Sequence, residues 1–172
     1  GIYASSVAET SIADNTITDV YATETSNVTA TYHYLYVEGI SANSTVDTVI
    51  EDNTIQDITS TIAADIDSNT GSAYSYGIYL NEMRSDDSST AVQNNSIDNI
   101  TATTASKSGS ANSQGINFLY GFSVVVNNNT IENVTANHSS ALADASTVAY
   151  VTGMYTAYFG NAVTVNQNTI ST

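Results

Sequence analysis

The side chains with the most chemical potential in this sequence form one charged cluster, in which Arg84 is followed by Asp86 and Asp87. Two carboxylates beside a basic group could act as an acid and base pair or could clamp a sugar. A glycosidase, however, needs its two carboxylates on opposite sides of the sugar, and neighbouring residues of one loop do not provide that arrangement. A solvated acidic loop neutralised by its own arginine accounts for the same residues. The sequence therefore predicts no catalytic residues and no enzyme.

Oxygen ligands for a calcium ion are the only metal ligands that the sequence suggests, since carboxylates are the groups that Ca²⁺ prefers. The two histidines, His33 and His138, are far apart and have no acidic or histidine neighbour at the spacing of a transition-metal site. Cysteine is absent, which excludes thiolate ligands and disulfides. No cofactor other than calcium is expected. The candidate calcium ligands are Glu51, Asp52, Asp86 and Asp87.

Tyrosine is abundant, with twelve copies and no tryptophan. Tyr32, Tyr34 and Tyr36 alternate along one segment, so on a strand they would lie on the same face. Exposed tyrosines are typical of subunit interfaces, and they also form platforms on which sugars stack. Both interpretations stay open for these three residues.

Seven asparagines stand in Asn-x-Ser/Thr sequons, which would suit a glycosylated exterior. The candidates are Asn27, Asn43, Asn94, Asn99, Asn128, Asn133 and Asn137.

The charge balance is strongly acidic, because 17 acidic residues oppose two basic ones and give a net charge of −15. Such a field repels nucleic acids and anionic membranes, so neither is expected as a partner. No stretch approaches the roughly 20 apolar residues that a membrane helix requires. The apolar fraction of 41% is ordinary for a folded domain. These features predict a folded extracellular or cell-surface protein with an acidic exterior rich in Thr, Ser and Asn.

A glycine followed by a bulky apolar residue recurs every 38 residues and organises the whole chain. A fixed period of this size is typical of a solenoid, in which each repeat buries its apolar face against the next. We therefore expect a single domain over residues 1–172, with units at 1–38, 39–76, 77–114, 115–152 and, in part, 153–172. The repeat glycines are Gly1, Gly39, Gly77, Gly115 and Gly153.

A second marker, Asn-Thr/Ser-Ile, lies inside each unit, and the positions around it are β-branched in almost every copy. This favours strands over helices. Antiparallel hairpins would call for turns such as Asn-Gly or Asp-Gly, and neither dipeptide occurs. Each unit is therefore predicted to hold one strand after the glycine, a second running into the asparagine and a third leaving it, all parallel to those of the next unit. The marker asparagines are Asn15, Asn53, Asn95, Asn129 and Asn168.

The two markers carry specific conformational expectations. The asparagine is expected to turn the chain in the left-handed conformation and to stack its amide on the asparagine of the next coil. The glycine marks another corner, where either a side chain has no room or φ is positive. The tyrosines two residues after a repeat glycine, Tyr3, Tyr79 and Tyr155, are expected to stack within the solenoid.

The third unit departs from the common spacing. Asn95 follows Gly77 by 18 residues, against 14 in the first, second and fourth units, and the next segment is shorter by the same amount. The sequence offers no reason for this compensation.

Three segments, Gly77-Ile78-Tyr79, Val92–Ile100 and Val126–Val134, resemble the coils of the pectate-lyase-like superfamily. The resemblance covers all five units and implies an all-β fold, a right-handed parallel β-helix (β-solenoid) of about four and a half 38-residue repeats. The superfamily includes polysaccharide-degrading enzymes, phage tailspikes and adhesin-like surface proteins, so the fold alone does not assign a function. Its enzymes use a basic residue beside calcium-binding acids or clustered aspartates, which makes the Arg84 cluster the place where such activity would lie.

A parallel coil rises about 4.8 Å per turn, so the stack would be roughly 22 Å tall. The chain opens on a repeat glycine and stops within the fifth unit, so we expect uncapped strand edges at both ends. Head-to-tail contact between identical subunits would continue the coil as a filament. The sequence thus predicts a self-assembling structural subunit of a filament, sheath or surface coat. The alternatives are a glycan-binding adhesin segment and a polysaccharide-active lyase or hydrolase.

Overall fold

The computed structural model describes residues 1–25, 32–63, 70–81, 89–139 and 148–171, and the regular elements in these ranges are β-strands. No helix in the described part of the chain is long and apolar enough to span a membrane. In chain order the strands are β1 (Ile2–Ser5), β2 (Ser11–Ala13), β3 (Thr16–Ile17), β4 (Val20–Glu24), β5 (Tyr32–Asn43), β6 (Thr48–Glu51), β7 (Thr54–Ile62), β8 (Thr70–Asn81), β9 (Ser89–Gln93), β10 (Ser96–Thr104), β11 (Ala111–Asn127), β12 (Thr130–His138), β13 (Ala149–Asn166) and β14 (Thr169–Ile170).

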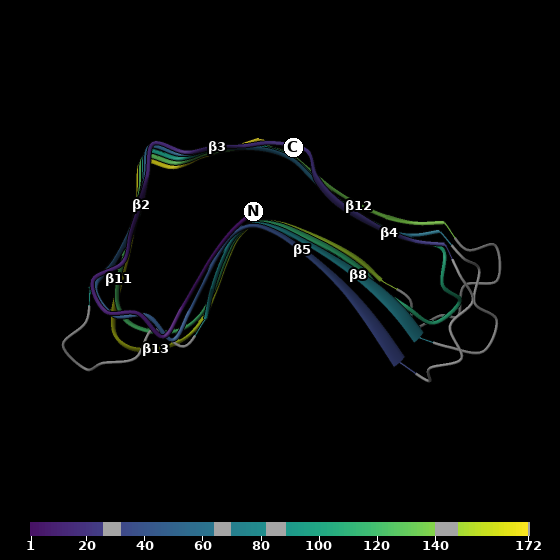
Figure 1. The fold of residues 1–172 in the computed structure, drawn as a ribbon, viewed down its shortest axis with the longest axis horizontal. Helices are drawn as coiled ribbons and strands as arrows, with labels where there is room; N and C mark the ends of the chain where they lie inside the picture. Colours follow the sequence, from purple (N-terminus) through teal and green to yellow (C-terminus); the bar gives the residue numbers. More distant parts are fainter. Residues whose placement is uncertain (26–31, 64–69, 82–88, 140–147, 172) are drawn as a thin grey trace.

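The strands stack as a parallel β-solenoid of about four turns, as the period predicts. Each strand pairs in parallel with its equivalent one coil away, so that Ile2 lies beside Ile40 and Ile78 beside Ile116. One sheet follows the order β1-β5-β8-β11-β9-β6-β2 with β13 on β11, and the other follows β14-β12-β10-β7-β3 with β4 on β7. Viewed in Figure 1, the coils overlay one another and share one bent cross-section, with the N-terminus at the bend.

Each coil contains the three predicted strand segments. One passes through the repeat glycine, one enters the marker asparagine and one leaves it, as β8, β9 and β10 do in the third coil. In the fourth and fifth coils the first two segments join into the long strands β11 and β13. This joining explains why the segments on both sides of the glycine bend belong to a single sheet.

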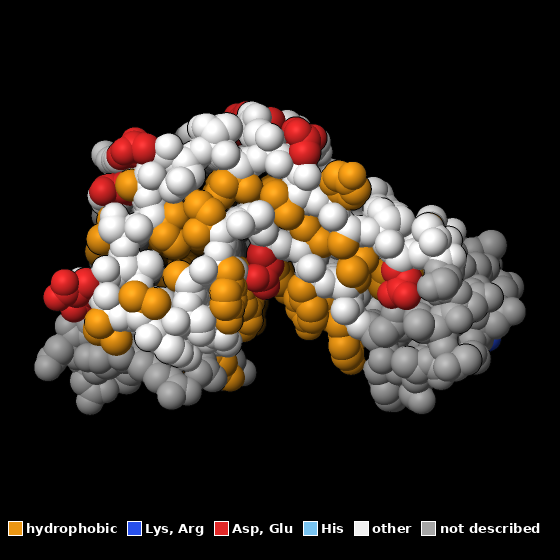
Figure 2. Space-filling model, in the orientation of Figure 1, with side chains coloured by type: hydrophobic (Ala, Val, Ile, Leu, Met, Phe, Trp, Pro, Cys, Tyr) orange, Lys and Arg blue, Asp and Glu red, His pale blue; other side chains and the backbone are white. Residues whose placement is uncertain are grey.

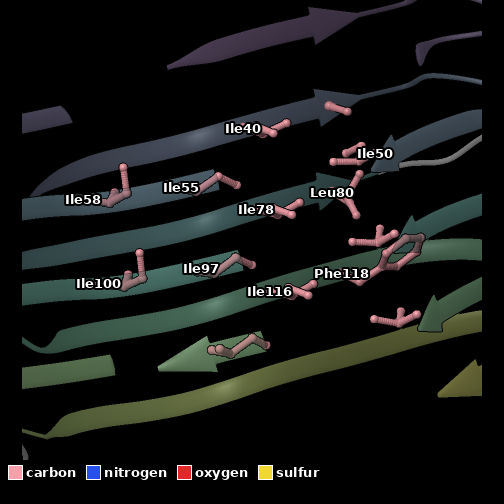
Figure 3. Packing of buried hydrophobic residues seen from close by; sticks show 14 of the residues in the cluster. Ile40, Ile50, Ile55, Ile58, Ile78, Leu80, Ile97, Ile100, Ile116 and Phe118 are labelled. Atoms are coloured by element: carbon pink, nitrogen blue, oxygen red, sulfur yellow. The ribbon is translucent and has the colours of Figure 1, made fainter. Parts of the chain in front are cut away.

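The core consists of vertical columns of β-branched residues contributed by both sheets. Ile40, Ile78 and Ile116 form one column, and they are completely buried. Figure 3 shows that Ile55 and Ile97, and likewise Ile58 and Ile100, occupy equivalent places in successive coils and point into the same interior. Burial of one such side chain contributes about 1.5–3 kcal/mol, so the repeated columns supply the main driving force for stacking.

The predicted asparagine ladder is present. The side-chain amide of Asn53 donates to Oδ1 of Asn95 at 2.9 Å, and Asn95 donates in the same way to Asn129 at 2.9 Å. The ladder continues downward from Asn53 to Asn15 and upward from Asn129 to Asn168. The backbone N–H of each lower asparagine donates to the same oxygen, so the ladder aligns the main chain as well as the side chains.

The expectation that these asparagines adopt the left-handed conformation is wrong. The residue directly before each one has positive φ, for example 56° at Asn94 and 54° at Asn128. A second left-handed column lies four residues after the ladder and includes Asp57 and Asn99, both at 56°. The ladder residue must keep its amide inside the coil, so the reversal of direction falls on its exposed neighbour, where Asp and Asn tolerate positive φ.

The repeat glycines mark a bend in a continuous strand and are needed because a side chain has no room there. None of the described glycines has positive φ, so the steric alternative holds. A Cβ on Gly77 would lie 2.5 Å from Cγ2 of Ile97 and 2.6 Å from the carbonyl oxygen of Gly115. The bend therefore brings the backbone into direct contact with the opposite sheet and with the next coil.

The displaced marker of the third unit is absorbed at corners, while the strands stay in register. Strand β9 pairs with β6 at an offset of 42 residues, as Ile50 with Val92, whereas β11 pairs with β8 at 38, as Ile78 with Ile116. The extra residues precede β9, and the matching deletion lies between β10 and β11. Strand alignment resumes after each corner, so the repeat length is restored by the next column of buried residues.

Candidate ligand-binding groove

The candidate site is a groove on the outward side of the strands that pass through the glycine bend. Val37 and Ile40 belong to the core, so the alternating positions around them face outward. Because the strand bends at the glycine, the outward side is concave. Figure 2 shows this hollowed side, with hydrophobic side chains along it and an acidic side chain between them. The groove residues are Tyr34, Tyr36 and Glu38 in β5, Ser41 after its bend, Tyr74, Tyr76 and Tyr79 in β8, Asn112, Gln114 and Asn117 in β11, and Tyr150, Thr152 and Tyr155 in β13.

Aromatic rings line the lower part of the groove. Tyr36 and Tyr74, from adjacent coils, are stacked with ring centroids 4.7 Å apart and planes at 12°. Tyr76 stacks on Tyr79 across the glycine bend at 5.2 Å. Tyr34 lies 6.4 Å from Tyr36 on the same strand face. The predicted platform is therefore part of a larger aromatic surface that spans two coils.

Of the predicted platform residues, Tyr34 and Tyr36 are 53% and 54% exposed, while the side chain of Tyr32 lies outside the described residues. The predicted stacking of Tyr3, Tyr79 and Tyr155 on one another is wrong. Ser41 and Asn117 alternate with them in the same column, so these tyrosines are two coils apart.

Amide side chains line the upper part, where the groove deepens into a hollow of about 360 Å³. Asn117 donates from Nδ2 to Oε1 of Gln114 at 2.6 Å, and Gln114 donates from Nε2 to Oδ1 of Asn112 at 3.0 Å. Oδ1 of Asn117 is buried and has no hydrogen-bond partner among the described residues. An unmet buried acceptor costs about 1–3 kcal/mol, which a bound donor would recover. The hollow is lined by Tyr76, Asn112, Gln114, Asn117, Leu119, Tyr150, Thr152 and Tyr155.

Glu38 is the one carboxylate among the groove residues named above, and it lies one coil below Tyr76 in the same column. Burial raises the pKa of this carboxyl, and a hydrogen bond with Ser41 partly offsets the shift. Burial also raises the pKa of the Tyr76 hydroxyl far above its ordinary value, with smaller contributions from Tyr36 and other neighbours. The groove thus combines aromatic faces, neutral amides and a partly desolvated negative charge.

The predicted calcium ligands do not form a cluster within the described residues. Oε2 of Glu51 accepts a hydrogen bond from Nε2 of Gln93 at 2.7 Å, and Asp52 is an exposed residue of the left-handed column. Arg84, Asp86 and Asp87 lie outside the described residues. No group of three His, Asp or Glu side chains suited to a metal occurs in the part of the chain that the structure describes.

The histidines contribute little to this site. Nε2 of His138 lies 2.8 Å from the carbonyl oxygen of Ser106, at a corner of the coil. The side chain of His33 lies outside the described residues.

The sequon asparagines lie mostly at exposed corners. Asn94 and Asn128 occupy the first left-handed column, and Asn99 and Asn133 the second. Asn137 is exposed, Asn43 is half-buried in β5, and Asn27 lies outside the described residues. Asn133 also donates to Asp98 at 2.8 Å.

The upper part of the groove was not predicted from sequence. Its signal lies in the columns one and three residues before each repeat glycine, which read Glu38, Tyr76, Gln114, Thr152 and Tyr36, Tyr74, Asn112, Tyr150. These columns hold only polar or tyrosine side chains, whereas the columns between them are small or apolar. Comparisons of the chain with protein-family models, with curated proteins and with solved structures returned no match.

Proposed function

We propose that this chain is a structural β-solenoid of an extracellular filament, sheath or surface coat, and that it assembles by stacking coil on coil with further copies. The observation that carries this proposal is the polarity of the asparagine ladder. At its lower end Oδ1 of Asn15 accepts no hydrogen bond from the described residues, and at its upper end the backbone N–H of Asn168 donates none to them. These two groups are the acceptor and the donor that pair at every internal step of the ladder.

The apolar columns support the same mode of assembly. Ile170 and Val165 in the last coil are 49% and 48% exposed, whereas their equivalents one coil below, Ile131 and Val126, are completely buried. A further coil on this face would bury them in the same way. The side walls, in contrast, carry the acidic residues seen around the outside of Figure 2, and the net charge of −15 opposes side-by-side aggregation.

The experiment compares two valine-to-lysine variants. Val165 lies in a core column at the open end, and Val125 is an exposed residue of the side wall. We expect the unmodified chain and Val125→Lys to form linear assemblies as concentration rises, and Val165→Lys to stay monomeric, because an ammonium group would be buried between coils. Sedimentation velocity and negative-stain microscopy measure this. Monomers of the unmodified chain at every concentration and salt level would contradict the proposal.

A second function, saccharide binding, is favoured by the groove. Tyrosine faces beside hydrogen-bonding amides suit a ligand that presents both apolar ring faces and hydroxyl groups. The stacking of coils would extend such a groove along the assembly, so the two functions are compatible. Binding of soluble oligosaccharides, measured by the shift of amide resonances or by calorimetry, tests it; loss of binding in Tyr36→Ala is expected.

A further inference from the structure

The electrostatic character of the groove restricts the kind of saccharide it can hold. Among the described groove residues no side chain is basic, and Glu38 supplies a negative charge at the centre of the aromatic part. The whole chain has only two basic residues against 17 acidic ones. An anionic sugar polymer would therefore meet repulsion without a compensating contact.

The hydrogen-bonding groups that lack partners are acceptors. The carboxylate of Glu38 accepts only, and Oδ1 of Asn117 has no partner within the described residues. Asn117 lies between Tyr79 and Tyr155 in its column, so a donor that enters between these rings would satisfy it. The groove thus favours a ligand rich in donors over one rich in acceptors.

The tyrosine faces add a preference for positive charge. Tyr36 lies two residues before Glu38 on the same strand face, and Tyr76 lies beside Glu38 in the next coil. A cation held close to aromatic faces gains about 0.5–2 kcal/mol, more when it is partly desolvated. Because the carboxylate lies among these rings, an ammonium group placed there would contact both.

Building on the saccharide-binding function proposed above, we infer that the groove binds an amine-bearing saccharide, a polymer of hexosamine units with free amino groups. The ammonium group pairs with Glu38, the sugar faces lie on the tyrosines, and the hydroxyl groups of the next units meet the amides of Asn112, Gln114 and Asn117. Neutral N-acetylated chains lack the ionic contact, and uronic-acid chains are repelled.

The test titrates the full chain with three sets of oligosaccharides of equal length: glucosamine, N-acetylglucosamine and galacturonic acid oligomers. Calorimetry at a pH where the amines are charged measures affinity. We expect the glucosamine oligomers to bind most tightly and Glu38→Gln to weaken them roughly tenfold, as loss of a charge-assisted hydrogen bond predicts. The same substitution should leave the affinity for N-acetylglucosamine oligomers unchanged.

Glu132→Gln is the matched control, because Glu132 is an exposed carboxylate on β12, which belongs to the other sheet. It removes the same charge from the molecule, so equal weakening by both variants would mean attraction of a polycation to an acidic protein and would overturn the inference. Equal affinity for acetylated and free-amine oligomers would also overturn it, while saccharide binding would stand. Failure of all three sets to bind would remove both. Circular dichroism confirms that each variant is folded.

Discussion

At the scale of single residues, each ladder asparagine satisfies an unusually large set of backbone and side-chain groups. Oδ1 of Asn95 accepts from the backbone N–H and the amide of Asn53, and its own amide donates to the carbonyl oxygens of Ile50 and Gln93 and to Asn129. These groups are buried, so the fold depends on residues that a composition analysis would count as surface polar.

Replacing Asn95 with alanine should therefore be costly. It leaves the buried donors of Asn53 and the carbonyl oxygen of Ile50 without partners, and at about 1–3 kcal/mol per group the free energy of unfolding should fall by at least about 3 kcal/mol. Urea denaturation followed by circular dichroism measures this. The control is Asn94→Gly, at an exposed position with positive φ where glycine fits without strain; a similar loss in both variants would contradict a specific role of the ladder.

Glu38 makes stability depend on pH in a defined direction. Its pKa is raised in the folded state by burial, so the folded protein holds this proton more tightly than the unfolded chain does. Its contribution to stability is complete below the unfolded pKa and is lost as pH rises through the folded pKa. We expect Glu38→Gln to be more stable than the unmodified chain at pH 7, and the difference to vanish near pH 4. Melting temperatures of both proteins across this range test it, and a constant difference would contradict it.

At the scale of elements, the glycine bend determines how the two segments of the long strands meet. Gly77→Ala places a methyl group against Ile97 and the carbonyl oxygen of Gly115, and overpacking of this kind costs about 1–3 kcal/mol. We expect a lower melting temperature together with a changed environment of Tyr76 and Tyr79, whose stacking crosses this bend. Thermal denaturation and near-UV circular dichroism measure both effects. An unaltered tyrosine signal would mean that the bend does not shape the groove.

The strands and the core could be predicted because the same residue types recur at fixed places. Ile55 and Ile97 announce their column by identity alone, and Asn53 and Asn95 announce the ladder. The groove could not be predicted in the same way, because its columns change residue type at each coil, as in Glu38, Tyr76 and Gln114. The left-handed corner was assigned to the wrong residue, since sequence gives no means of telling which of two adjacent polar residues turns inward.

At the scale of the whole molecule, the acidic exterior is a source of self-repulsion within the folded stack. Sodium chloride screens these charges over about 10 Å at 0.1 M, so the melting temperature should rise by several degrees between low and moderate salt, a shift of the size that about 1 kcal/mol produces. Calcium chloride at equal ionic strength is the control for a specific cation site. A melting temperature independent of salt would contradict the repulsion.

The corners of the third coil have a consequence for how such a protein can change. Because strands β9 and β10 keep their alignment despite added and deleted residues on either side, the corners can be lengthened or shortened separately from the rungs. Foreign peptides could be grafted there at regular vertical intervals, and the scaffold would present them as an evenly spaced array.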